Sequence, residues 1–202
     1  MKIDPKELDT KSLYNILKGV VLPRPIGWIS SVSATGVPNL APFSFFTVVS
    51  RNPPMVSISI LPKSGHDILK DTLNNIRETG QFVVNVVSLT LADQMHLTSA
   101  EHSPDTDEFE VAGLEKDPSD LINVPRVAGA PVSMECVVDR IIQVGNVGDH
   151  VVFGEVRRFH IRDDVWLGNA RINVAAIDPV GRMALNYCLT DRTFDTSVQK
   201  NI

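Results

Sequence analysis

Histidines and cysteines are the residues that most often bind metals or act as nucleophiles, and in this chain they occur singly. The two cysteines, Cys136 and Cys188, form no CxxC pair, so neither a zinc site nor a disulfide framework is indicated. We interpret both as buried, reduced thiols. None of the five histidines is spaced as in an HExxH helix: His66, His96, His102, His150 and His160. The sequence therefore predicts no metal site.

Glycine-rich nucleotide loops and hydrolase motifs are also missing from the sequence. There is no GxGxxG after a strand and no GxxxxGK[ST], so neither a dinucleotide fold nor a P-loop is indicated. Gly65, His66 and Asp67 would suit a hydrolytic pairing, but no GxSxG elbow accompanies them. Any cofactor must therefore bind to a different arrangement of donors.

A hairpin rich in aromatic and hydroxyl side chains is the remaining candidate. The run PRPIGWISS at 23–31 is followed by Gly36 and then by PNLAPFSFFT at 38–47. Hydroxyls and amides of this kind can bind a phosphate. The composition alone fits equally well phenylalanines that fill a core and serines that are ordinary strand hydroxyls.

The order of these residues resembles the flavin reductase-like domain family, the FMN-binding split-barrel group that includes flavoredoxins. The match continues through NPP at 52–54, KDT at 70–72, GQFVVN at 80–85 and GDHVVFGEV at 148–156, and so covers roughly residues 15–195. The resemblance implies a mainly β fold, a closed antiparallel Greek-key split β-barrel of about six strands with a few peripheral helices. It also implies FMN as the cofactor.

The resemblance further implies which residues contact FMN. In the family, the segment that matches 39–47 runs along the isoalloxazine ring with backbone amides facing its polar edge, and such donors stabilise a reduced flavin. Pro42 removes one donor and stiffens this segment. Lys70 and its neighbours are expected at the phosphate. The expected cofactor-binding residues are Trp28, Ser30, Ser31, Asn39, Ala41, Pro42, Phe43, Ser44, Phe45, Thr47, Lys70, Asp71 and Thr72.

His150 is the residue to which the resemblance gives a catalytic role, close to the nicotinamide or acceptor side of the flavin. It would position or hydrogen-bond a substrate, because hydride transfer needs stacking and orientation more than a protein acid. A histidine that begins a strand is otherwise structural. Trp28 either packs under the barrel or touches the cofactor. Asn85, polar among valines, needs a partner, which is either the cofactor or a neighbouring loop.

The implied activity is that of an FMN-dependent oxidoreductase, in which NAD(P)H reduces the flavin and a small-molecule or protein acceptor takes the electrons. Three alternatives stay open: a bound flavin that reduces an organic substrate, a non-catalytic FMN-binding electron carrier, and a barrel that has lost its cofactor. The family also implies a homodimer with each flavin near the subunit boundary. The match weakens over 181–187, so the wall that meets the second substrate is undefined.

Strands in hairpin order must position this site, which favours an antiparallel barrel. We expect one strand over 26–33 and a second, paired with it, over 39–50. Alternating apolar residues predict a strand over 55–61, and further strands are expected over 82–87, 132–144, 150–161 and 166–177.

Helices are expected over 5–18, 65–79 and 90–100. Ser64 and Asp67 resemble a capping box for the second helix, and Gly80 stands where a C′ glycine belongs. Residues 101–131, rich in charge, proline and glycine, predict a long, partly ordered connection over the barrel or a partner.

The length and net charge of the chain limit which classes of protein it can belong to. The 202 residues fit one domain over 1–202, with a short N-terminal helix and an irregular C-terminal tail. The formal net charge of −5 argues against nucleic-acid binding, which needs a basic face. No apolar stretch is long enough for a membrane span, and the start lacks the apolar core of a secretory signal. We therefore expect a cytoplasmic protein.

Overall fold

One antiparallel sheet of seven strands forms the centre of the protein, in the order β3-β2-β6-β9-β10-β5-β4. The computed structural model describes residues 1–63 and 68–190. The strands of this sheet are β2 (Gly27–Val32), β3 (Pro38–Phe43), β4 (Phe46–Arg51), β5 (Pro54–Ile60), β6 (Gln81–Val86), β9 (Val132–Val144) and β10 (Asp149–Ile161). The predicted mainly β class is confirmed, with one strand more than expected. Barrel closure stays a prediction, because within the described ranges no ladder joins the edge strands β3 and β4.

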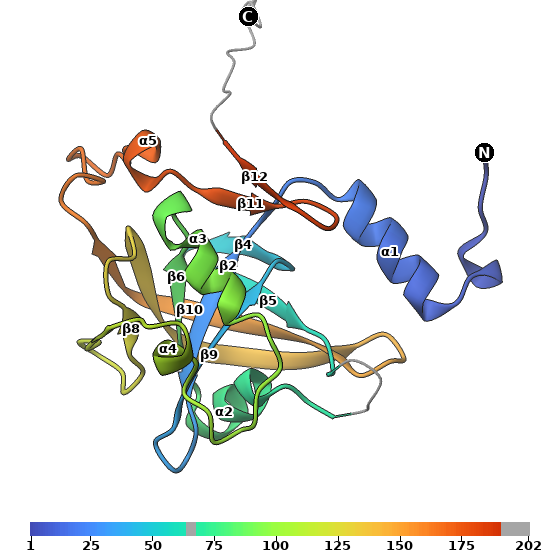
Figure 1. Ribbon diagram of the computed structural model, residues 1–202, viewed down its shortest axis with the longest axis horizontal. Coiled ribbons are helices and arrows are strands. Elements are labelled where there is room, and N and C mark those ends of the chain that lie inside the picture. The colour runs from blue at the N-terminus through green and yellow to red at the C-terminus, as the bar shows by residue number, and fades with distance from the viewer. Residues whose placement is uncertain (64–67, 191–202) are drawn as a thin grey trace, which may run out of the picture.

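Smaller elements surround the sheet. A three-stranded sheet joins β1 (Arg24–Pro25), β11 (Val180–Arg182) and β12 (Tyr187–Leu189), and β7 (Lys116–Asp117) pairs with β8 (Arg126–Val127). In Figure 1, helix α1 stands to one side of the sheet, next to the β11–β12 hairpin, while α2 and α3 lie against the body. The helical segments are η1 (Pro5–Glu7), α1 (Thr10–Val20), α2 (Asp71–Thr79), η2 (Leu89–Leu91), α3 (Ala92–Leu97), α4 (Glu108–Val111) and α5 (Val174–Ile177).

The predicted single strand over 39–50 is wrong, because the chain bends at Ser44 and Phe45. Before the bend, Phe43 pairs with Gly27 of β2; after it, Phe46 pairs with Ile58 of β5. The carbonyl of Phe45 accepts a hydrogen bond from the Ser59 amide at 2.8 Å, which fixes the bend against β5. The chain thus passes from one edge of the sheet to the other within two residues.

Strand β2 is buried on both faces, which explains its nearly continuous apolar and small residues. Ile29 packs with Ile58, Phe82 and Leu73 in the cluster toward α2, whereas Trp28 belongs to a second cluster toward α3 and α4. Alternate side chains of a strand point to opposite faces, so each face of β2 supports a separate core.

The side chain of Asn85 joins the central sheet to the connection over residues 101–131. Its amide donates to the Trp28 carbonyl and to Ser30 Oγ, and its Oδ1 accepts from Val127 N at 3.0 Å and from Ser133 Oγ. Of the two expected partners for this buried side chain, the structure supports the neighbouring loop.

Several predicted boundaries change. Helix α2 begins at Asp71, and the expected caps Ser64 and Asp67 lie outside the described residues. Gly80 does end this helix in the left-handed conformation, with φ 69°. The strand expected over 166–177 is wrong: an isolated bridge joins Trp166 and Ile172, and α5 follows.

In the described part of the chain no helix is long and apolar enough to cross a membrane, and cytoplasmic residence stays a prediction.

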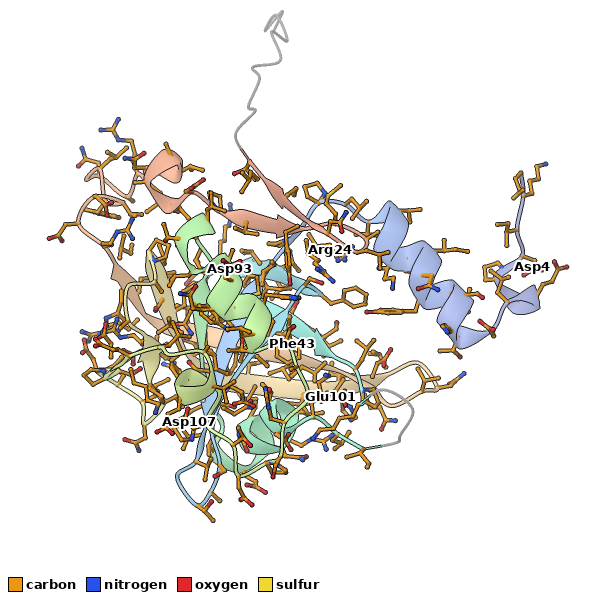
Figure 2. All side chains as sticks on the ribbon, viewed as in Figure 1. Asp4, Arg24, Phe43, Asp93, Glu101 and Asp107 are labelled. Atoms are coloured by element: carbon orange, nitrogen blue, oxygen red, sulfur yellow. The ribbon has the colours of Figure 1, made fainter. Side chains whose placement is uncertain are left out.

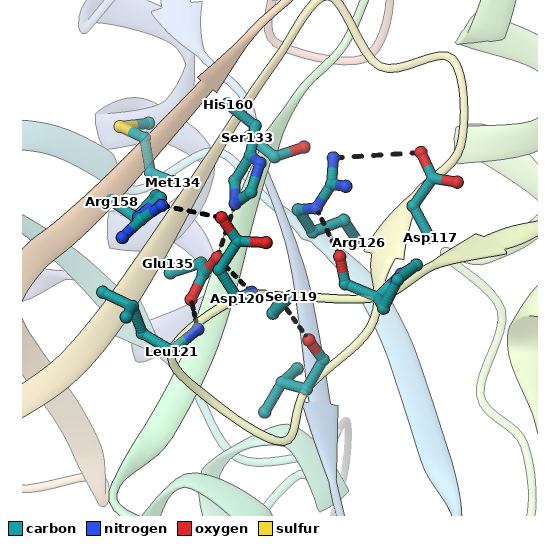
Figure 3. Close-up of polar contacts among 12 residues, drawn as sticks. Asp117, Ser119, Asp120, Leu121, Arg126, Ser133, Met134, Glu135, Arg158 and His160 are labelled. Carbon is teal, nitrogen blue, oxygen red and sulfur yellow. Dashed lines mark hydrogen bonds and ion pairs between the residues drawn. The ribbon is translucent and has the colours of Figure 1, made fainter.

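The connection over 101–131 is ordered, and one buried carboxylate anchors it. Glu135 of β9 is fully buried, and its two oxygens accept the backbone amides of Asp120 and Leu121, each at 2.8 Å. His160 Nε2 lies 2.5 Å from the same carboxylate (Figure 3). Burial alone would raise the pKa of Glu135, but the hydrogen bonds from Asp120 N, His160 and Leu121 N outweigh it and hold the pKa below its ordinary value.

The same cluster has the residue types of a metal site, since Asp120, Glu135 and His160 place their ligand atoms within 4.8 Å of one another. Both oxygens of Glu135 are already used by backbone donors. Asp120 is paired with the Arg158 guanidinium at 2.8 Å, and that positive charge opposes a cation. These contacts account for all three side chains as an anchor of the connection.

Replacing Glu135 by Gln should lower the free energy of unfolding by roughly 1–3 kcal/mol at pH 7, because an amide cannot accept both backbone donors. The pKa of Glu135 is lower in the folded state, so its contribution is full above the unfolded pKa of about 4.3 and is lost as the pH falls through the lower folded value. The difference between wild type and Glu135→Gln should therefore shrink in acid. Urea unfolding from pH 3 to 7 measures it, with the exposed Glu110→Gln as control; a difference independent of pH would contradict the anchor.

Candidate functional site

Two cavities that share Pro42, Phe43 and Ser44 lie at the end of β3. The first has a volume of about 220 Å³ and is lined by Tyr14, residues 41–45, Ser59, Leu61, Lys70 and residues 98–100. The second, of about 330 Å³, shares Tyr14, Pro42, Phe43, Ser44 and Ser99 with it and extends to Arg182, His96 and Tyr187. Ala41 to Phe45 and Lys70, six of the predicted cofactor-binding residues, therefore do converge on one hollow.

The outer edge of β3 presents few backbone donors before the bend. The Leu40 amide, which points away from β2, donates to Glu108 Oε2 at 3.0 Å, and Pro42, two residues on, has no N–H. In the bend itself, the amides of Ser44 and Phe45 form no hydrogen bond within the described residues. The bend thus carries two backbone donors that are available to a ligand, both at residues that line the first cavity.

Lys70 brings positive charge to the first cavity, at the start of α2. It is the N-cap residue, and its side chain makes no capping hydrogen bond with the described residues of this helix. The first amides of a nine-residue helix and its dipole favour an anion there. Lys70 Nζ lies 3.9 Å from Glu101 Oε1, a half-exposed pair. Asp71 is paired with Lys63 at 2.9 Å, so a phosphate would meet its backbone amide and not its carboxylate.

Ser31, Asn39 and Thr72 are also brought together, but with one another. Asn39 Oδ1 accepts Thr72 Oγ1 at 2.7 Å and Ser31 Oγ at 3.3 Å, while its amide donates to Glu108 Oε1 at 2.9 Å. All four side chains are buried. Burial raises the pKa of Glu108, opposed by hydrogen bonds from Leu40 N and Asn39. These three predicted residues support β3 and α2 from inside.

The remaining predicted residues lie apart from the two cavities. Trp28 is fully buried and donates to Thr98 Oγ1 at 2.9 Å, and Ser30 donates to the Pro125 carbonyl at 2.6 Å. Thr47 is exposed on β4 and contacts the Val48 carbonyl. For all three, direct contact with a cofactor stays a prediction.

His150 is buried on β10, opposite Ile60, at the end of the sheet. Its Nδ1 has no hydrogen-bond partner among the described residues. Next to it, Asp149 lines a third cavity of about 860 Å³ beneath α1, together with Lys63 and Lys70. Burial raises the pKa of Asp149, and His150 opposes that shift. The catalytic role of His150 stays a prediction.

Arg24 joins the segments around the two cavities. Its buried guanidinium donates to the carbonyls of Lys18 and Val21 at the end of α1, at 2.7 and 2.8 Å, and to the Met183 carbonyl at 3.1 Å. Its Nε donates to Ser44 Oγ at 3.3 Å. Burial lowers the pKa of Arg24; Tyr14 opposes the shift and Arg182 adds to it. Figure 2 shows Arg24 between α1 and the β11–β12 hairpin.

Sequence reasoning missed the residues that come to the cavities from a distance. Tyr14 of α1 lines all three cavities, but it was assigned no role from the sequence. His96, Arg182 and Tyr187 belong to segments with no recognised motif. The sequence contains one indication of them: the match to the family weakens over residues 181–187, which left the wall of the pocket that meets the second substrate undefined.

Comparison with known proteins places the chain in a known group. The model of the flavin reductase like domain matches residues 20–177. The structure of nitrilotriacetate monooxygenase component B from Bacillus cereus superposes with a TM-score of 0.92 at 34% identity, covering 97% of this chain and 98% of that one. The 2-nitrobenzoate 2-nitroreductase of Pseudomonas fluorescens gives a TM-score of 0.90 at 32% identity, covering 100% and 98%.

A third structure bears on the fold alone. A Shewanella frigidimarina protein with a split barrel domain superposes with a TM-score of 0.84 at 23% identity, over 97% of this chain and 98% of that one. The seven-stranded sheet of the present chain thus has the arrangement of strands found in that domain.

Replacing Arg24 by Met should lower the free energy of unfolding by roughly 2–4 kcal/mol, because several charge-assisted hydrogen bonds are lost at a buried site. It should also release α1, so that amide exchange over residues 10–20 accelerates more than exchange in β6 and β9. Urea unfolding and hydrogen exchange measure the two effects. Arg51→Met, at an exposed position on β4, is the control. Unchanged exchange in α1 would contradict the linking role.

Proposed function

The chain belongs to the flavin reductase-like domain family, and we propose that it binds FMN along residues 41–45 and uses it to transfer electrons from NAD(P)H to a second acceptor. Family membership supports flavin-related oxidoreductase chemistry. The observation that supports FMN binding here is the bend at Ser44 and Phe45: both residues line the first cavity, Ser44 also lines the second, and the two backbone amides have no hydrogen-bond partner among the described residues. We also propose that the sheet closes as a split barrel around this bend.

The residues around the first cavity fit a flavin mononucleotide. A flavin needs a flat apolar surface, hydrogen-bond donors at its polar edge and positive charge for one phosphate. Pro42, Phe43 and Phe45 offer the first, the bend amides and Ser44 the second, and Lys70 with the start of α2 the third. Bound FMN would supply reversible uptake of a hydride.

The protein groups would act by binding and orientation. The donors of the bend are fixed by the Phe45–Ser59 hydrogen bond and by Arg24, so they need not reorganise when charge develops on a ligand. Tyr14 of α1 would cover the cavity and limit the access of water. Ser31, Asn39 and Thr72 would hold this arrangement from behind. His150, whose Nδ1 has no hydrogen-bond partner among the described residues, would position or hydrogen-bond a substrate.

The second candidate function is reduction of an organic molecule by the bound flavin. The likeness to a 2-nitrobenzoate 2-nitroreductase at 32% identity favours it. The second cavity, which adjoins the first through Pro42 and Ser44, provides a place for such a molecule. The likeness to a monooxygenase component supports delivery of electrons to a partner instead.

A homodimer is part of the proposal. Helix α1 has no buried residue, and its apolar Leu17 and Val20 are 54% and 70% exposed. Strand β4 is a sheet edge with Val48 73% exposed. Exposed apolar residues on a helix and an open strand edge are features of a surface that a second subunit covers.

Replacing Leu17 by Glu should therefore raise the dimer dissociation constant at least about tenfold, because a charge would be buried in an apolar contact. Analytical ultracentrifugation over a concentration series measures it. Asn15→Glu adds the same charge to the same helix at a polar position and should have a smaller effect. A monomeric wild type at all concentrations would refute the dimer.

FMN should bind the purified protein and lose fluorescence on binding. Replacing Lys70 by Met should raise the FMN dissociation constant about tenfold, the usual effect of losing one charge-assisted contact to a phosphate. Riboflavin, which lacks the phosphate, should bind both proteins equally. Lys6→Met, an exposed lysine in η1, is the matched control. Failure of wild type to take up FMN would disprove the proposal.

Anaerobic addition of NADH and of NADPH to the loaded protein then separates the functions. Bleaching of the flavin absorbance by either nucleotide identifies a reductase. If neither nucleotide bleaches the flavin but dithionite does, the protein is an electron carrier.

A further inference from the structure

Among the residues that the structure describes, the lining of the second cavity carries positive charge and no acidic side chain. Its ten lining residues include Arg182 and His96 but neither aspartate nor glutamate. The whole chain, by contrast, carries a formal net charge of −5. The absence of carboxylates around this hollow is therefore a local feature and not a reflection of overall composition.

Arg182 is held in place without a counter-ion. Its guanidinium stacks on the Tyr187 ring, 4.6 Å from the ring centroid, and no carboxylate pairs with it among the residues that the structure describes. Arg182 also lies opposite Arg24 in the small sheet, close enough to lower the pKa of Arg24. Two neighbouring guanidiniums without an acid favour an anion beside them.

The neighbouring side chains complete a polar wall. Tyr187 Oη and His96 Nδ1 are hydrogen-bonded at 2.9 Å, with the two rings nearly perpendicular. This hydrogen bond joins the β11–β12 hairpin to α3 and so holds the hairpin that carries Arg182 in place. Ser99 and Ser44 add hydroxyls where the two cavities meet.

We propose that this wall is a subsite for the anionic group of the molecule that exchanges electrons with the flavin, and that Arg182 is its principal contact. The inference rests on the proposed function, since the flavin would occupy the adjoining cavity. The ligand chemistry is an oxyanion attached to a planar ring, which Pro42 and Tyr14 would flank. Such an oxyanion belongs either to an aromatic carboxylic acid or to the phosphates of a nicotinamide nucleotide.

Binding of benzoate and of its neutral counterpart benzamide tests the subsite directly. Calorimetry on the flavin-free and the FMN-loaded protein should show benzoate binding at least tenfold more tightly than benzamide. Arg182→Met should abolish that preference, whereas Arg182→Lys should keep part of it. Arg77→Met, an exposed arginine of α2, is the control and should behave as wild type.

A second arm identifies the source of the oxyanion. The concentration of NADH that half-saturates anaerobic flavin reduction is compared with that of 1-benzyl-1,4-dihydronicotinamide, which has no phosphate. An increase of about tenfold or more in Arg182→Met for NADH alone assigns the subsite to the nucleotide. Loss of the benzoate preference without that increase assigns it to a carboxylic acid.

The subsite is overturned if neither quantity changes in Arg182→Met, or if wild type binds benzoate and benzamide equally and reduction by NADH is unaffected. FMN titration of the same variants keeps the two proposals separate. Arg182→Met that takes up FMN normally but loses anion preference supports the subsite. A wild type that takes up no FMN refutes the proposed function, while the flavin-free benzoate titration still decides the subsite.

Discussion

The buried guanidinium of Arg24 is the interaction on which the arrangement of the site depends. It is the point where the end of α1, the bend after β3 and the β11–β12 hairpin meet, and these segments are distant in the chain. A guanidinium suits this position because its planar fork donates to several carbonyls at once. The segments contribute Tyr14, Ser44 and Arg182 to the cavities, so a single side chain fixes the spacing among three walls.

Besides joining the walls, Arg24 brings positive charge close to the two cavities. The oxygens that accept hydrogen bonds from Arg24 are uncharged carbonyl and hydroxyl oxygens, and Arg182 lies beside it without a carboxylate partner in the described structure. Lys70 adds a third cation to the lining of the first cavity, 3.9 Å from Glu101. In a protein that is acidic overall, three cations at or beside the two cavities would favour anionic ligands there.

Periodicity predicted most of the fold, because the strands alternate or carry long apolar runs. The bend at Ser44 and Phe45 escaped it: residues 39–50 keep the composition of one strand, and the change of partner depends on the Ser59 amide of another strand. Motif order located residues 41–45 and Lys70 near one cavity. Arg182 and Tyr14 could not be predicted, because their approach depends on how separate segments pack.

Polar residue type did not reveal which hydroxyls face a ligand and which face the protein. Ser31, Asn39 and Thr72 are buried because Glu108, 69 residues beyond Asn39, supplies the acceptor that completes their network. The same carboxylate occupies the Leu40 amide, and Pro42 lacks one, so the edge of β3 is closed up to the bend. Along this segment of the described structure, the available backbone donors are therefore those of Ser44 and Phe45. A change in the buried network would alter the proposed flavin binding only by shifting β3, so its effect should accompany a loss of stability, unlike the loss of the contact proposed for Lys70.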